Sequence, residues 1–176
     1  MILRNEDRGV IKNWQNLGIL TAINVDAFRR ATQAGNIVVI CGDCERSGDM
    51  YDHMRSIMGH RRIHLKAYNG GPLRLNENVP IPEKFRAHDQ FLAGLEESRI
   101  KKGIPCLTLV GHYPCLVASD IGYDINQTLL KVLETKIMIC QKFSWDPDQI
   151  FTFFHIDDNK VMRTFNANAI KEVAVV

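Results

Sequence analysis

The amino-acid sequence predicts an α/β protein: a mostly parallel sheet of about five strands, covered by helices in a three-layer arrangement, with an antiparallel strand at one edge. Two observations favour this class. Short runs of β-branched and apolar residues alternate with longer stretches in which apolar residues recur every three or four positions. The last two apolar runs are separated only by turn-forming residues, which is typical of a hairpin.

The strands are expected where a short apolar run is bounded by glycine, proline or turn residues. The first run, Asn-Ile-Val-Val-Ile, follows Gly35, and the second is stopped by the turn Asn69-Gly70-Gly71-Pro72. The last two runs flank residues 157–160, Asp-Asp-Asn-Lys, which we expect to form a four-residue hairpin turn. The five expected strands cover residues 36–40, 63–68, 106–110, 150–156 and 161–165.

Three helices are expected between these strands, over residues 47–58, 83–102 and 126–141. The middle one follows two prolines and ends at Gly103. Its apolar stripe consists of Phe85, His88, Leu92 and Leu95, which are spaced as one helix face requires.

The length of 176 residues predicts a single domain, and no repeat, low-complexity tract or linker interrupts the chain. Within it we expect a helical N-terminal arm over residues 1–35, outside the sheet, and the α/β domain over 36–176. The apolar share of 45% and the charged share of 24% are those of a globular protein. A net charge of +2 gives no indication of a nucleic-acid or membrane-surface partner. With no long apolar run and a charged N-terminus, we expect a cytoplasmic protein.

Two clusters of polar residues directly follow predicted strands: residues 41–46, Cys-Gly-Asp-Cys-Glu-Arg, and residues 111–115, Gly-His-Tyr-Pro-Cys. In a parallel sheet both would lie at the carboxyl ends of strands, where open α/β folds carry their sites. If the two strands are neighbours, Cys41, His112 and Cys115 converge. Two thiolates and one imidazole suit a zinc ion, with a fourth position for water or Asp43.

This pattern resembles the β-class carbonic anhydrases. That family carries a Cys-x-Asp-x-Arg loop after its first strand, an Asn-Ala-Gly loop after the second and Gly-His-x-x-Cys after the third. Here Cys41-Gly-Asp43, Asn69-Gly70-Gly71 and Gly111-His112-x-x-Cys115 occur in that order. The resemblance covers about residues 36–165.

The resemblance implies that Cys41, His112 and Cys115 ligate zinc and that Asp43 either takes the fourth position or pairs with the loop arginine. Arg46 is the candidate arginine. The family has one residue between the aspartate and the arginine, whereas this chain has two, Cys44 and Glu45. Whether Asp43 reaches Arg46 therefore depends on the path of this loop.

The resemblance also implies the activity: a carbonate dehydratase, a lyase that hydrates carbon dioxide reversibly to bicarbonate with a zinc-bound hydroxide. It further implies a homodimer or higher homo-oligomer. Two alternatives stay open, namely a zinc-binding homologue without this activity and a thiol oxidoreductase that uses the Cys41-x-x-Cys44 pair. A third interpretation takes His112 and Cys115 as a buried pair with no metal.

Overall fold

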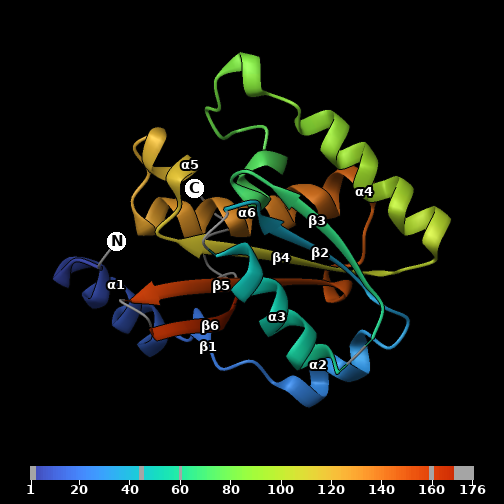
Figure 1. Ribbon diagram of the computed structural model, residues 1–176, viewed down its shortest axis with the longest axis horizontal. Helices are drawn as coiled ribbons and strands as arrows, with labels where there is room; N and C mark the ends of the chain where they lie inside the picture. The colour runs from blue at the N-terminus through green and yellow to red at the C-terminus, as the bar shows by residue number, and fades with distance from the viewer. Residues whose placement is uncertain (1–2, 44–45, 60, 159–160, 169–176) are drawn as a thin grey trace.

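The computed structural model describes residues 3–43, 46–59, 61–158 and 161–168. Figure 1 shows these residues as one twisted sheet with helices packed around it. The sheet has six strands in the order β1-β6-β5-β4-β2-β3. Their bounds are β1 Leu20–Thr21, β2 Asn36–Cys41, β3 Ile63–Tyr68, β4 Cys106–Tyr113, β5 Ile150–Asp158 and β6 Val161–Ala167.

The four strands β3, β2, β4 and β5 are parallel, and β6 and β1 extend the sheet in antiparallel pairing. The predicted class, an α/β fold with a mostly parallel sheet and an antiparallel strand at one edge, is confirmed. β2 and β4 are the two inner strands of the parallel part of the sheet and are buried along nearly their whole length, which explains why they appear in the sequence as continuous apolar runs.

The helices form layers on the two faces of the sheet. The longer ones are α1 Asn5–Asn16, α2 Val25–Ala31, α3 Ser47–Met58, α4 His88–Lys102 and α6 Ile125–Phe143, with a short α5 at Leu116–Asp120. Alternate side chains of β2 face opposite layers: Ile40 packs in a cluster with Met54 of α3, and Val39 in a cluster with Leu95 of α4. Figure 1 accordingly shows α3 and α4 on opposite sides of the central strands.

Two differences from the predicted elements concern the N-terminal part and the hairpin. Residues 1–35 were expected to be helical and outside the sheet, yet Leu20–Thr21 pairs with Ala167 and Asn166 of β6 and adds a sixth strand. Two residues are too few to show an alternating pattern, so the sequence gives no sign of this strand. β5 and β6 pair as far as Asp158 and Val161, so the predicted turn of four residues is wrong, and residues 159–160 lie outside the described chain.

The predicted helix over residues 83–102 begins five residues later, at His88. Glu83–Phe85 instead forms a 3₁₀ turn (η2), and Arg86 has an extended backbone that separates this turn from α4. Phe85, predicted on the buried stripe, is consequently 54% exposed, whereas Leu92 and Leu95 of that stripe are buried as expected. The helix ends at Gly103, which adopts the left-handed conformation typical of a C-terminal cap.

Candidate metal centre

Three metal-ligating side chains converge at the carboxyl ends of the two central strands. Cys41 is the last residue of β2, His112 lies near the end of β4, and Cys115 directly precedes α5. The two strands are parallel neighbours, which brings their ends to the same edge of the sheet. The ligand atoms of the three residues lie within 4.8 Å of one another, and all three residues are buried. The structure therefore contains a Cys/His/Cys group that can hold a metal ion.

The Gly70-Gly71 turn after β3 fixes the position of Cys41. The backbone N–H of Gly70 donates a hydrogen bond to the Cys41 Sγ atom over 3.1 Å. A Cβ atom on Gly71 would lie 2.8 Å from the Cys41 backbone nitrogen and 3.0 Å from the Ile40 carbonyl carbon, closer than packed atoms allow. Both glycines have positive φ angles, of 91° and 53°. Glycine is thus required here by backbone conformation and by the close approach of two chain segments.

The side chains of Cys41 and Cys115 interact, and the interaction shifts their pKa values in opposite directions. The hydrogen bond with Cys115 lowers the pKa of Cys41 to about 4 against the opposing effect of burial, with further lowering from His112 and the Gly70 amide. The same hydrogen bond, together with burial, raises the pKa of Cys115. Cys41 is therefore the thiol that loses its proton more readily, and a metal ion that binds both sulfurs would also have to displace the proton of Cys115.

The imidazole ring of His112 has a feature that a bound metal ion would explain. Both of its ring nitrogens are buried, and neither has a hydrogen-bond partner among the residues that the structure describes. A buried polar atom without a partner costs about 1–3 kcal/mol, so native proteins rarely contain one. A metal ion between His112 and the two sulfurs would give one ring nitrogen its missing partner.

Asp43 and Arg46 do meet, despite the two residues between them. The Arg46 Nη1 atom lies 3.5 Å from the Asp43 Oδ2 atom, and the two side chains are 11% and 15% exposed. The backbone makes this possible because the N–H groups of Arg46 and Ser47 both donate to the Asp43 carbonyl oxygen, over 3.3 and 2.8 Å. These two hydrogen bonds tie the start of α3 to Asp43.

A third charged residue, Asp157, completes this group and was missed by the sequence analysis. Its Oδ2 atom accepts a hydrogen bond from the Arg46 Nε atom over 3.1 Å and lies 2.9 Å from Arg46 Nη2. Asp157 was expected in the hairpin turn, but β5 continues through it. The alternation along the strand, which puts Phe153, His155 and Asp157 on one face, is the signal that identifies it.

A cleft of about 710 Å³ opens beside the ligand group. Its polar lining includes Cys41, Cys115, Asp43 and Arg46. Its apolar lining consists of Ile81, Pro82, Phe85, Pro114, Leu116, Val117 and Ile121. A small molecule in this cleft would contact both the ligand group and an apolar wall.

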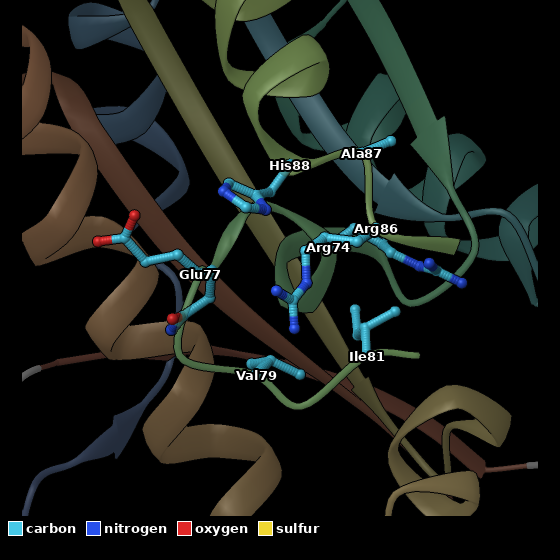
Figure 2. A pocket seen from close by; sticks show the side chains of 8 residues that line it. Arg74, Glu77, Val79, Ile81, Arg86, Ala87 and His88 are labelled. Atoms are coloured by element: carbon cyan, nitrogen blue, oxygen red, sulfur yellow. The ribbon is translucent and has the colours of Figure 1, made fainter. Parts of the chain in front are cut away.

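A second, much smaller hollow is lined by Arg74 and by residues between Asn76 and His88 (Figure 2). Figure 2 shows Arg74 in the middle of it, with His88 above and Val79 and Ile81 below. Arg74 donates from Nε to the Asn69 carbonyl over 2.7 Å and from Nη1 to the Phe85 carbonyl over 2.5 Å. Arg74 therefore links the β3 turn to the η2 turn, and it lines both hollows.

No helix within the described ranges combines the length and the apolar character needed to cross a lipid bilayer. The described cysteines, Cys41, Cys106, Cys115 and Cys140, carry free thiols. Cys44, the second thiol of the redox alternative, lies outside the described residues.

Comparison with known proteins adds little to this geometry. No protein-family model matches the sequence, and no curated protein sequence matches it. Among solved structures, a carbonic anhydrase from Streptococcus mutans is similar with 15% sequence identity and a TM-score of 0.48, over 96% of this chain and 100% of that one. The assignment of the fold therefore stands on the strand pairing described above, and that of the site on its three ligand side chains.

Proposed function

We propose that this protein is a zinc enzyme that hydrates carbon dioxide reversibly to bicarbonate. The observation that carries the proposal is the buried group of Cys41, His112 and Cys115, whose ligand atoms lie within 4.8 Å of one another beside an open cleft. The order of the three loop motifs in the sequence, which resembles that of the β-class carbonic anhydrases, supports the same activity.

The donor set fits zinc. Thiolate sulfur and imidazole nitrogen are the ligands that Zn²⁺ prefers, and three protein ligands are typical of a catalytic zinc site. The contact with Cys115 lowers the pKa of Cys41, which favours the thiolate that a metal ion binds, and His112 has two buried nitrogens that no described residue satisfies. A zinc ion held here would lower the pKa of a water molecule toward about 7 and so supply hydroxide under physiological conditions.

The residues around the ligands have separate tasks in this proposal. Asp43 lies in the cleft, and its ion pair with Arg46 keeps the carboxylate from serving as a fourth ligand. Val117 and Ile121 contribute to an apolar wall, which suits carbon dioxide because that molecule is small and uncharged. The buried position of the three ligands limits the access of bulk water to the reacting atoms.

We also propose that the protein is a cytoplasmic homodimer or higher homo-oligomer. Phe85 and Leu116, at the cleft, are 54% and 70% exposed, and large exposed apolar side chains near a site are typical of an interface. The free thiols are in keeping with a reducing compartment.

The test is a stopped-flow carbon dioxide hydration assay on zinc-loaded protein. We expect activity in the parent, loss of activity together with zinc in Cys115→Ser, and reduced activity with zinc retained in Asp43→Asn. Cys106→Ser is the matched control, because that thiol is buried elsewhere and donates to the Ala31 carbonyl over 3.2 Å. It should leave both zinc and activity unchanged.

Folded, zinc-loaded parent protein that hydrates no carbon dioxide above the buffer rate would overturn the proposed activity and leave a metal-binding protein of another function. Folded protein that binds no zinc but cycles two electrons with a dithiol through Cys41 and Cys44 would favour the redox alternative.

A further inference from the structure

Arg46 is held between two carboxylates that come from different parts of the chain. Asp43 precedes it in the same loop, whereas Asp157 lies on β5, 111 residues along the sequence. The exposed fractions of the three side chains, 15% for Asp43, 11% for Arg46 and 18% for Asp157, are far below those of surface ion pairs. Charges this poorly solvated interact more strongly than charges at the surface.

The two carboxylates hold Arg46 differently. The Asp157 Oδ2 atom lies 3.1 Å from Nε and 2.9 Å from Nη2, so it contacts both nitrogens on one edge of the guanidinium group at hydrogen-bond distance. Asp43 lies 3.5 Å from Nη1, which is ion-pair distance but longer than a hydrogen bond. The tighter of these two contacts is the one with Asp157.

The position of Arg46 matters for the metal, because Asp43 could take the fourth ligand position if Arg46 did not pair with it. Arg46 lies at the start of α3, three residues beyond Asp43, so a contact from another element can fix the position of its side chain. β5 provides such a contact because it is a rigid strand of the sheet, paired with both β4 and β6.

We propose that Asp157 is a positioning residue that anchors Arg46 and, through Arg46, keeps Asp43 paired and away from the metal ligands. The part that concerns the metal rests on the proposed function, whereas the anchoring of Arg46 does not. Without Asp157, Arg46 turns away, and the Asp43 carboxylate is released to take the fourth ligand position.

The anchoring is tested without metal by NMR, from the exchange rate of the Arg46 Nε–H proton with water. We expect Asp157→Asn to speed this exchange by about tenfold or more, since a charge-assisted hydrogen bond is lost. Asp43→Asn should leave the rate within about twofold, because the Asp43 contact described above is with Nη1, whereas Nε donates to Asp157. Asp158→Asn is the matched control: this neighbouring carboxylate pairs with Arg8 over 2.8 Å and should leave the rate unchanged.

The effect on the ligand position is tested with Co²⁺ in place of zinc and thiocyanate as an added ligand. We expect thiocyanate to change the visible spectrum of the cobalt-loaded parent and of Asp158→Asn, but not that of Asp157→Asn. The double variant Asp157→Asn/Asp43→Asn should regain the response, because its side chain at position 43 no longer carries the competing charge.

An Nε–H exchange rate in Asp157→Asn equal to that of the parent would overturn the proposal, as would an unchanged thiocyanate response in that variant. Failure of the proposed function is a separate result: a parent that hydrates no carbon dioxide still gives both readouts. If the parent takes up no cobalt, the proton exchange rate alone decides whether Asp157 anchors Arg46.

Discussion

Replacement of Gly71 by alanine tests the account of how the β3 turn positions Cys41. Two costs are expected. The residue has a φ of 53°, and an L-residue in the left-handed region costs about 1–2 kcal/mol relative to glycine. Its new Cβ atom would in addition lie 2.8 Å from the Cys41 backbone nitrogen, where no flexible side chain can yield.

Gly103→Ala separates these two costs. Gly103 has a φ of 59°, nearly the same backbone conformation, but a Cβ atom there would meet nothing within 4 Å. We expect Gly103→Ala to lower the free energy of unfolding by about 1 kcal/mol. Gly71→Ala should lower it by about 3 kcal/mol, because overpacking against fixed atoms typically adds 1–3 kcal/mol.

Urea denaturation of the two variants measures the difference directly. Gly71→Ala should lose about 2 kcal/mol more stability than Gly103→Ala. At an m value of about 2 kcal/mol/M, this difference lowers the urea midpoint of Gly71→Ala by about 1 M more. Because the clash falls on the backbone of Cys41, Gly71→Ala should also weaken zinc binding by about tenfold or more, whereas Gly103→Ala should not. Equal midpoints and equal zinc affinities in the two variants would refute the reasoning.

Three further predictions concern the rest of the molecule. Trp145→Phe removes the hydrogen bond that the buried indole N–H donates to the Pro105 carbonyl over 2.7 Å. Urea denaturation should show that the free energy of unfolding falls by about 1–3 kcal/mol. An unchanged urea midpoint would contradict this. Burial lowers the pKa of His53, so the folded state binds fewer protons than the unfolded state, and the free energy of unfolding falls as the pH drops below about 6.5. His53→Leu should make this acid-induced loss of stability shallower, as measured by urea titrations between about pH 7 and 5. An unchanged dependence on pH would count against the prediction. The Arg8–Asp158 pair lies at the surface, so Arg8→Ala should leave the urea midpoint unchanged within error, and a clear shift would show that this pair is more than a surface contact.

The centre of the fold and the ligand group were open to prediction because they depend on local patterns. β2 and β4 are buried on both faces, so their sequences are continuous apolar runs with clear ends. The polar residues that follow them must lie at one edge once the strands are parallel neighbours. The convergence of Cys41, His112 and Cys115 follows from these two features.

The features that the sequence did not reveal depend on long-range pairing. β1 has two residues and exists only because β6 offers it a partner. Phe85 has the spacing of a buried helix face, but the extended backbone at Arg86 breaks the helix before α4 begins. Asp157 looks like a turn residue until the register of β5 with β6 is known, and its contact with Arg46 spans 111 residues.

The most direct test of the account is the metal content of protein purified without chelator, measured by elemental analysis beside Cys115→Ala and Cys106→Ala. The account predicts about one zinc per chain in the parent and in Cys106→Ala, and none in Cys115→Ala, because Cys115 is one of three ligands that lie within 4.8 Å of one another. Folded, reduced parent protein without zinc, or a Cys115→Ala variant that keeps its zinc, would contradict it.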